Sequence, residues 1–299
     1  MKKWLTRALI VVLIFVFGGA GAIAYALHRA DERMNRRIDI PAYSVAIPTG
    51  PEALERGRYL YSTRGCADCH GADGAGRAFV DDGSVRIKGA NISPGPGSVV
   101  AKYTPADWER TLRHGVKPDG RPVIVMPSED YNRLTDADLG ALVAYIQQLP
   151  PAKGGPAELV LPLPYRAMYG LGQIPDAATM IDHSRKPAAP VAEGVTVEHG
   201  AYVSAMCIGC HGEGLSGGKI PTGPPDWPPA PNLTPGQGSV LPRYADAAAL
   251  MAMMRSGKRP DGTAIEVMPF DSFKHITDTD LAALHLYLKS LPPKPAGGR

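Results

Sequence analysis

The pattern of hydrophobic and polar positions begins with an uncharged, mostly apolar stretch over residues 8–27, with basic residues on both sides. In a helix, twenty residues at about 1.5 Å each span about 30 Å, the thickness of the hydrocarbon core of a bilayer. The alternative is a cleaved signal peptide, because Ala24-Tyr25-Ala26 has the small-x-small form of a cleavage site. The length of the stretch favours a retained signal-anchor or transmembrane helix over residues 1–30.

Behind this stretch, one series of sequence blocks occurs twice, about 141 residues apart. Residues 57–60 are matched by 200–203, 91–98 by 232–239, 115–126 by 257–268, and 134–151 by 276–293. A Cys-x-x-Cys-His motif occupies the same place in each series. Five matched blocks in the same order predict two tandem copies of one domain, over residues 53–150 and 194–292.

The last block of each copy has the pattern of an amphipathic helix. Apolar residues recur at spacings of three and four, at Leu139, Leu142, Val143, Ile146 and Leu149 and again at Leu281, Leu284, Leu288 and Leu291. Thr135 and Thr277 stand where an N-cap belongs. Three residues later, Asp138 and Asp280 are placed to complete a capping box. Double prolines end both helices. Further helices are expected over 57–63 and 200–205, which lead into the cysteine motifs, and over 104–114 and 245–255.

The sequence therefore predicts an all-α fold of two tandem domains behind an N-terminal transmembrane helix. Residues 31–52 are expected to be a tether, polar at first and later punctuated by proline. Residues 151–193 are rich in proline, glycine and alanine, which fits either a flexible linker or an ordered strap over the domain interface. Their length and the apolar run over 159–163 favour the strap. Residues 293–299 are a tail.

Composition narrows the possible functions. The chain has 34 glycines and 30 prolines, which suits small domains whose long loops wrap around something other than side chains. A net charge of +3 is too small to argue for nucleic-acid binding. The sequence also has neither a phosphate-binding glycine loop nor a basic strip interleaved with aromatic residues.

All four cysteines fall in two motifs of the form Cys-x-x-Cys-His, Cys66-Ala-Asp-Cys69-His70 and Cys207-Ile-Gly-Cys210-His211. A c-type haem needs two thiols to add across its vinyl groups and an imidazole on its iron, and one short helical segment with this spacing supplies all three. The motif is a specific signal for haem attachment. It predicts two covalently bound haem c groups, held by Cys66, Cys69, Cys207 and Cys210, with His70 and His211 as axial iron ligands.

Two other uses of paired cysteines are weaker. A zinc knuckle brings its two cysteine pairs together from tens of residues apart, whereas these pairs lie in separate repeats. A thioredoxin-like redox pair needs a strand-helix-strand context, which the pattern lacks.

The second axial ligand of each haem is predicted to be a methionine. Met126 is the only methionine between residues 51 and 151, and Met268 has the matching position, each followed by proline. Methionine and histidine ligation raises the reduction potential of haem iron, as suits electron transfer. The alternative is a methionine that fills a gap in the core, and this is the better interpretation of Met251, Met253 and Met254, which have no counterparts.

Four other residues are weaker functional candidates. His114 aligns with Ser256 and is expected at the surface or at a helix end, and His285 aligns with Val143 and is expected to be a partly buried helix residue. Trp108 aligns with Leu250, which indicates packing. Asp68 has no partner in the pattern that would make it an acid or base. No catalytic residue is predicted.

Taken together, these motifs resemble the class I cytochrome c domain, over about residues 53–150 and 194–292. In that family the first and last helices cross near a Gly-x-x-x-aromatic motif, which residues 57–61 match. Ser204 stands at the aromatic position of the second copy, so that crossing must differ. The Arg-Gly-Arg-Tyr-Leu start, the Asn-Ile-Ser-Pro loop and the Pro-Asp-Gly…Met-Pro stretch are similar to membrane-anchored haem subunits of periplasmic dehydrogenases. Many of those have three haem domains, whereas this chain has two.

The resemblance implies a non-enzymatic carrier of single electrons between a dehydrogenase or quinol-oxidising partner and a terminal acceptor. The alternative is a dihaem subunit of a haem–copper oxidase. A dihaem peroxidase or a thiosulfate-oxidising enzyme is disfavoured by the paired Met-Pro positions and by the lack of a spare cysteine.

Basic residues do not determine the orientation of the predicted anchor, since they are as frequent after it as before it. Because c-type haem is attached outside the bacterial cytoplasm, the haem domains are expected in the periplasm, tethered to the inner membrane by one span.

Overall fold

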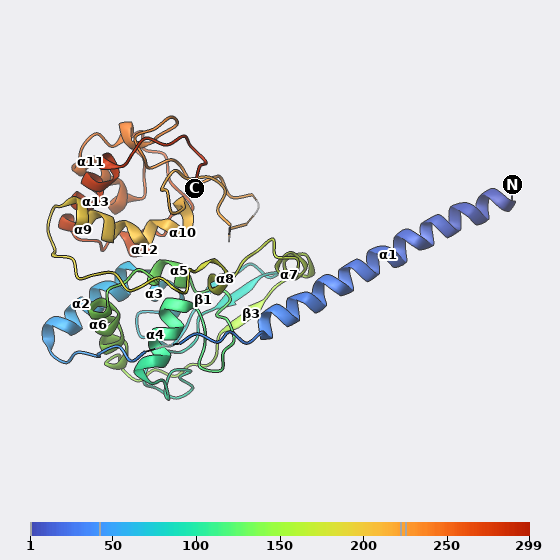
Figure 1. Cartoon of the computed structure of the whole chain (residues 1–299), viewed down its shortest axis with the longest axis horizontal. Coiled ribbons are helices and arrows are strands. Elements are labelled where there is room, and N and C mark those ends of the chain that lie inside the picture. The colour runs from blue at the N-terminus through green and yellow to red at the C-terminus, as the bar shows by residue number, and fades with distance from the viewer. Residues whose placement is uncertain (1, 42, 222, 225) are drawn as a thin grey trace.

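The computed structural model describes residues 2–41, 43–221, 223–224 and 226–299. Met1 and Ala42, which belong to the predicted anchor and tether, lie outside the described residues. The chain forms a two-lobed, mostly helical body from which helix α1 (Lys2–Asn35) projects (Figure 1). The prediction of two tandem helical domains behind an N-terminal apolar helix is confirmed.

The first lobe contains the first copy of the repeat. Its helices are α2 (Pro51–Thr63), α3 (Cys66–His70), α4 (Pro105–His114), α5 (Ser128–Tyr131) and α6 (Asp136–Gln147). Its core gathers apolar side chains from the first, middle and last of these helices, among them Leu60, Leu112, Leu139, Leu142 and Ile146. The predicted apolar face of α6 is therefore the face that packs inward.

The second lobe repeats this arrangement. Its helices are α9 (Val197–Val203), the 3-10 turn η1 (Ser204–Cys207), α10 (Ile208–His211), the 3-10 turn η2 (Leu241–Arg243), α11 (Ala247–Ser256), α12 (Phe270–Phe273) and α13 (Asp278–Ser290). Met253 and Met254 are buried in its core, as expected of residues that fill space there.

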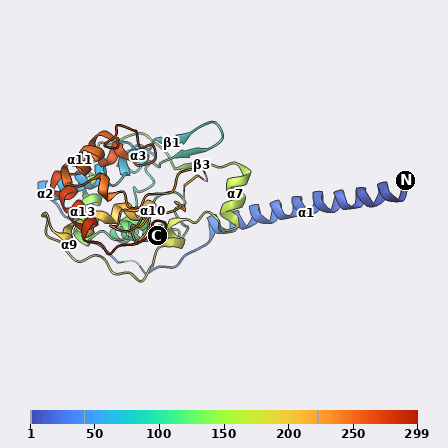
Figure 2. The same ribbon diagram turned by 90° about the horizontal axis from the view of Figure 1, so that it is seen from above.

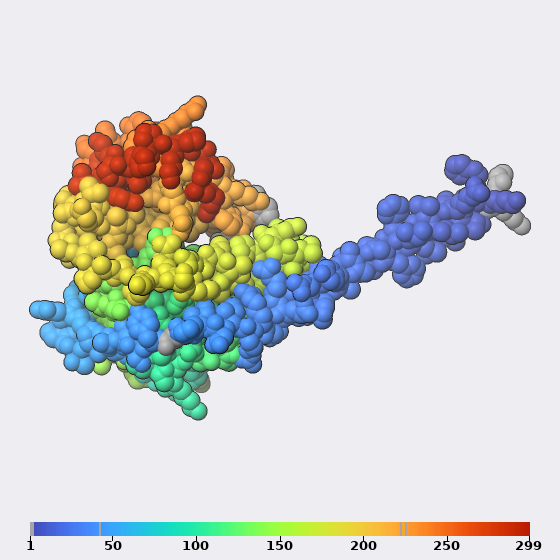
Figure 3. All heavy atoms as spheres, in the orientation of Figure 1, coloured from blue at the N-terminus to red at the C-terminus, as the bar shows by residue number. Residues whose placement is uncertain are grey.

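The segment between the two lobes is an ordered strap. It contains strand β3 (Glu158–Val160) and the short helices α7 (Leu163–Gly170) and α8 (Ala177–Met180). Strand β3 pairs antiparallel with β2 (Arg86–Lys88), which pairs in turn with β1 (Ala78–Asp81). This small sheet was not expected from the sequence. In Figure 3 the strap runs as a yellow-green band along the boundary between the lobes.

A glycine permits the first and last helices of each lobe to cross closely. A Cβ atom at Gly57 would lie 2.1 Å from the carbonyl oxygen of Ala141, and one at Gly200 would lie 2.0 Å from that of Ala283. Both distances are far inside van der Waals contact, so only glycine fits. The aromatic part of the motif differs, because Tyr61 donates to the Gly71 carbonyl oxygen at 2.6 Å whereas Ser204 bonds within its own turn. The two crossings thus share the glycine and differ beside it.

The N-caps of the last helices are confirmed, but their capping boxes are wrong. The Thr135 hydroxyl accepts from the Asp138 amide at 3.1 Å, and the Thr277 hydroxyl accepts from the Asp280 amide at 3.1 Å. Neither aspartate returns the bond, because both carboxylates are engaged in the interface between the lobes. A complete capping box is found instead in α4, between Thr104 and Asp107.

The close crossing predicts a strong response to one methyl group. Gly57→Ala should lower the free energy of unfolding by about 1–3 kcal/mol, because the added carbon forces α2 away from α6. Gly155→Ala is the matched control, since a Cβ at Gly155 has no neighbour within 4 Å. Thermal unfolding followed by circular dichroism measures both. Equal midpoints for the two variants would show that the crossing tolerates a side chain.

Candidate functional site

Each cysteine motif follows the first helix of its lobe: the first motif forms α3, and the second begins at the end of η1 and continues as α10. In the first lobe, α2 ends at Thr63 and Gly65 adopts φ 77°, a left-handed turn that favours glycine, before α3 begins at Cys66. In the second lobe, α9 continues through η1 into α10 without such a turn. Cys66 and Cys207 are buried beside their lobes' cores.

The cysteines do not have the properties of a redox pair or a zinc site. Burial raises the pKa of the Cys66 and Cys207 thiols to about 12, and that of the Cys69 and Cys210 thiols to about 11. Attacking thiols of thioredoxin-like proteins have a lowered pKa instead. Within the described ranges, no three His, Cys, Asp or Glu side chains gather in a way that could hold a metal ion.

Both motif histidines are oriented as iron ligands require. The Nδ1 atom of His70 lies 2.7 Å from the carbonyl oxygen of Ala90, and that of His211 lies 2.9 Å from the carbonyl oxygen of Pro231. Since a carbonyl can only accept, the proton is assigned to Nδ1, and Nε2 keeps its lone pair for a metal. Burial also lowers the pKa of both imidazoles, which favours the neutral form.

A buried asparagine follows each of these carbonyl groups and holds it in place. The side-chain amide of Asn91 donates to the carbonyl oxygens of Pro96 and Ala152, both at 3.1 Å. Asn232 makes the same pair of bonds in the second lobe, to Gln237 and Lys294. Neither asparagine is exposed. The matched loops had been noticed as a repeat, but sequence reasoning missed this role because the bonds go to backbone atoms.

The two Met-Pro segments also have matching geometry. The Ser128 amide donates to the Met126 carbonyl oxygen at 2.8 Å, and the Phe270 amide donates to that of Met268 at 2.9 Å. Met126 is half-buried against the core that contains Cys66, and Met268 is half-buried against the core that contains Cys207. Each methionine therefore lies in the same lobe, and against the same core, as the cysteine motif it was paired with.

The attachment segment of each lobe contacts the helix that follows the Met-Pro segment of the other lobe. The Gly209 amide, inside the second motif, donates to the Asp130 carboxylate at 3.0 Å. In the matching contact, the Ser272 hydroxyl donates to the carboxylate of Asp68, inside the first motif, at 2.8 Å. Asp68 thus has a partner that the sequence did not reveal. Figure 1 shows α3, α5, α10 and α12 gathered at the boundary between the lobes.

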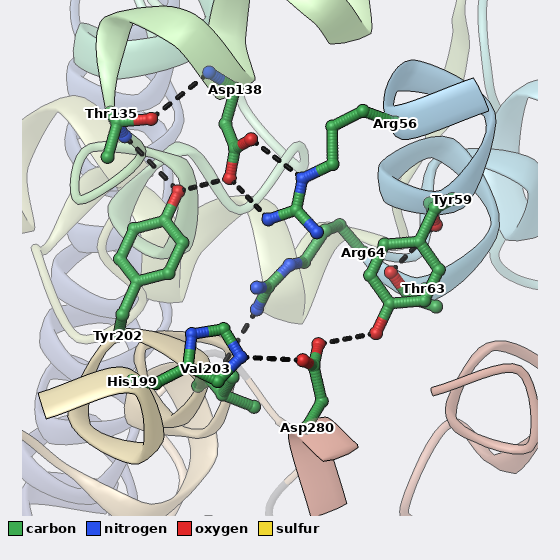
Figure 4. Close-up of polar contacts among 10 residues, drawn as sticks. All are labelled: Arg56, Tyr59, Thr63, Arg64, Thr135, Asp138, His199, Tyr202, Val203 and Asp280. Atoms are coloured by element: carbon green, nitrogen blue, oxygen red, sulfur yellow. Dashed lines mark hydrogen bonds and ion pairs between the residues drawn. The ribbon is translucent and has the colours of Figure 1, made fainter. Parts of the chain in front are cut away.

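Around these contacts, two tyrosines exchange hydrogen bonds between the lobes (Figure 4). Tyr59 of α2 donates to the Asp280 carboxylate at 2.5 Å, and its repeat counterpart, Tyr202 of α9, donates to the Asp138 carboxylate at 2.6 Å. Burial, with the neighbouring carboxylate, raises the pKa of both phenols to about 12, so both remain donors. The reciprocal bonds give the interface an approximate two-fold symmetry.

Each aspartate has a second partner, and here the symmetry is broken. Arg56 binds Asp138 with two hydrogen bonds, at 2.8 and 2.7 Å. Burial opposes ionisation of Asp138, but its bonds to Arg56 outweigh that effect and lower its pKa. The residue that matches Arg56 is His199, whose Nε2 lies 2.7 Å from the Asp280 carboxylate. The same site is therefore held by a permanent cation in one half and by an imidazole in the other.

The other candidates have structural positions. His114 ends α4 as expected, but it is buried rather than at the surface, with its Nδ1 atom 3.0 Å from that of His183 in the strap. His285 is buried on α13 and bonds the Tyr244 carbonyl oxygen at 2.9 Å. Trp108 packs edge-on against Tyr103.

The residues present fit two haem c groups. Each lobe supplies an adjacent pair of cysteines, an imidazole whose free Nε2 is fixed by a backbone bond, and a thioether against the same core. Sulfur and imidazole nitrogen are the donors that covalent attachment and low-spin haem iron require.

Both lobes match families of known proteins. Residues 52–146 match the family described as cytochrome c oxidase, cbb3-type, subunit III, and residues 197–292 match the cytochrome c family.

Several relatives match most of the chain. The fructose dehydrogenase cytochrome subunit of Gluconobacter japonicus is 28% identical over 83% of this chain and 54% of its own length. The cytochrome c subunit of the quinone alcohol dehydrogenase of Gluconobacter oxydans is 28% identical over 82% of this chain and 56% of its own. A diheme cytochrome c-type protein of Cereibacter sphaeroides is 29% identical over 57% of each chain. The chain spans little more than half the length of these relatives. Two matched domains and two intact attachment motifs make it a dihaem c-type cytochrome with two covalently bound haem c groups.

Proposed function

We propose that this protein is a membrane-anchored periplasmic electron carrier that passes single electrons from a dehydrogenase or quinol-oxidising partner to a terminal acceptor. The observation that carries the proposal is the duplicated site: two attachment motifs, each with an oriented histidine and a methionine against the same core, contact each other's lobes. The likeness to cytochrome subunits of dehydrogenases supports the dehydrogenase as the donor.

The ligand assignment is part of the proposal. Cys66, Cys69, Cys207 and Cys210 form the thioethers, His70 and Met126 ligate one iron, and His211 and Met268 ligate the other. Haem iron, when bound, supplies the one-electron chemistry. The protein's task is to hold the ligands, which it does through the Ala90 and Pro231 carbonyl groups and the buried asparagines behind them. Two ligands on each iron leave no open position for a substrate.

Membrane attachment through α1 is supported by its exposure and by its packing. Residues 3–35 form an apolar helix long enough to span a bilayer, and its most apolar part is not buried against the body. Ala26 and Ala30, near its end, are instead buried against α7. Cleavage after Ala26 would divide this packed segment, which argues for retention.

A dihaem subunit of a haem–copper oxidase is the second candidate, because the first lobe matches the family of cbb3-type oxidase subunits III. The two candidates differ in the protein that accompanies the chain. If the chain is a dehydrogenase subunit, its partner is a flavin, quinoprotein or molybdenum enzyme. If it is an oxidase subunit, its partner is a copper-containing oxidase.

Purification from native membranes under mild detergent distinguishes these partners. We expect a dehydrogenase subunit to copurify, and we expect its substrate to reduce both haems of the complex. Mass spectrometry identifies the subunits, and the haem absorption spectrum reports reduction. Copurification of a haem–copper oxidase with no dehydrogenase would favour the second candidate.

The proposed methionine ligands can be tested by measuring the reduction potentials of the two haems. Met126→His should lower the potential of one haem by a sizeable part of the roughly 0.8 V range that axial ligands cover, because imidazole stabilises ferric iron more than thioether does. Met268→His should shift the other wave of the potentiometric titration. Met251→Leu, a half-buried methionine without a repeat counterpart, is the control and should move neither. A titration of Met126→His that overlays the wild type would exclude Met126 as a ligand.

The interface tyrosines can be tested by stability. Tyr59→Phe should lower the free energy of unfolding by about 1–3 kcal/mol, because it removes a hydrogen bond from the buried Asp280 carboxylate. Tyr145→Phe is the control, since the Tyr145 hydroxyl has no hydrogen-bond partner among the described residues. Thermal unfolding of the haem-loaded protein measures both. If the two variants unfolded at the same temperature, the bond between the lobes would contribute nothing to stability.

A further inference from the structure

Helix α7 of the strap carries an exposed apolar face. Leu163 begins the helix and Leu171 follows its last residue, and both side chains are more than half exposed, at 57% and 54%. Ala167, which is half-buried, stands midway, four residues from each, so the three share one side of the helix. A contiguous exposed apolar surface on a protein usually marks an interaction site.

A neighbouring side of α7, which carries Arg166, Tyr169 and Gly170, is fixed to α1. A Cβ atom at Gly170 would lie 2.0 Å from the carbonyl oxygen of Ala26, so the two helices approach as closely as a glycine permits. Arg166 pairs with Asp31 at 2.8 Å, and the Arg33 guanidinium lies 4.9 Å above the Tyr169 ring. Helix α7 therefore cannot move independently of α1.

A buried ion pair also fixes this unit to the body. Arg36, just beyond α1, binds Asp176 of the strap with two hydrogen bonds at 2.6 and 2.8 Å, and Tyr169 donates to the same carboxylate at 2.7 Å. Asp176 is fully buried. The strap in turn joins the first lobe, where β3 pairs with β2 and α8 contacts α5. The direction of α1 is thus fixed relative to the first lobe, although α1 contacts the body only near its end.

The contact between α7 and α1 lies at the end of the apolar stretch of α1. It involves residues 26–33 of α1, which begin where the apolar stretch over residues 8–27 ends. Exposed aromatic residues, Trp4 and Tyr25, stand near the two ends of that stretch, as in the aromatic belts of membrane helices. Figure 2 shows α7 lying across α1 at the point where α1 leaves the body. A helix across a membrane span, at the end of its apolar stretch, lies along the bilayer surface.

We propose that α7 is a membrane-surface helix whose face of Leu163, Ala167 and Leu171 rests in the interfacial region of the bilayer that α1 spans. This inference rests on the membrane attachment in the proposed function. An apolar face inserted at the boundary between headgroups and acyl chains is the usual mode of binding for such helices. With α1 and α7 as two non-parallel contacts, the membrane fixes both the height and the tilt of the haem domains, so that a donor in the same membrane meets one defined surface.

Single fluorophores can test where α7 lies. The four native cysteines are all in the attachment motifs, so an introduced cysteine is the one free thiol of the haem-loaded protein. Phe15→Cys, Leu163→Cys, Leu171→Cys and Val195→Cys, all at exposed positions, are labelled with an environment-sensitive dye. The full chain is reconstituted into phosphatidylethanolamine–phosphatidylglycerol vesicles. Quenching by nitroxide-labelled lipid is compared with quenching by iodide in the buffer, and the haem spectrum checks folding.

We expect lipid quenching to dominate at positions 15, 163 and 171, and iodide quenching to dominate at the control, position 195, beside α9 in the other lobe. Lipid quenching at 15 with iodide quenching at 163 and 171 would overturn the role of α7 and leave the anchor intact. Iodide quenching at all four positions would overturn the anchor, and with it this inference. Protection from both quenchers at 163 and 171 would mean that a second copy of the chain covers the face, which also overturns it.

Discussion

Two buried carboxylates constrain the arrangement of the whole molecule. Asp138 and Asp280 lie in the first turn of the last helix of their lobes, and both are more than nine-tenths buried. A buried charge without partners costs several kcal/mol, so each must be bonded. In each case one of the partners, Tyr202 or Tyr59, comes from the other lobe. Separation of the lobes would expose the carboxylates to water but remove these bonds, so the lobes act as one body.

This constraint also brings the two candidate haem sites together. The lobes join through the side that carries the attachment helices, and each motif has a contact with the other lobe, through Asp130 in one case and Asp68 in the other. Burial, aided by Glu129, raises the pKa of Asp130 well above its usual value. The donor is a backbone amide in one of the matching contacts and a serine hydroxyl in the other, so the two haem environments are not equivalent although the fold repeats.

How much the sequence predicted depended on the distance over which an interaction acts. Thr135 was identified as an N-cap because its partner is three residues away, and His70 and His211 could be predicted as iron ligands because the motif is contiguous. The hydrogen-bond partners of the Asp138 carboxylate could not be predicted. Arg56 is 82 residues away in the sequence, and Tyr202 is 64 residues away and belongs to the other lobe. The pairing of β3 with β2 was missed for the same reason, because β3 lies 70 residues or more from its partner strand. Repeats predict equivalent local structure, but they do not predict how the copies face each other.

The strap explains why a protein of this kind has ordered chain between its lobes. A flexible linker would suffice to keep two domains near each other. This one instead pairs a strand with the first lobe, buries Asp176 against Arg36 and packs Gly170 on α1. Each of these contacts joins the strap to the first lobe or to the anchor. The second lobe is held mainly by the two-fold interface, so the strap's distinct effect is to fix α1 to the body formed by the two lobes. In the proposed membrane-attached arrangement, a rigid α1 restricts the orientations in which a partner in the same membrane can meet the haems. Because electron transfer weakens steeply with separation, that restriction favours one route of entry.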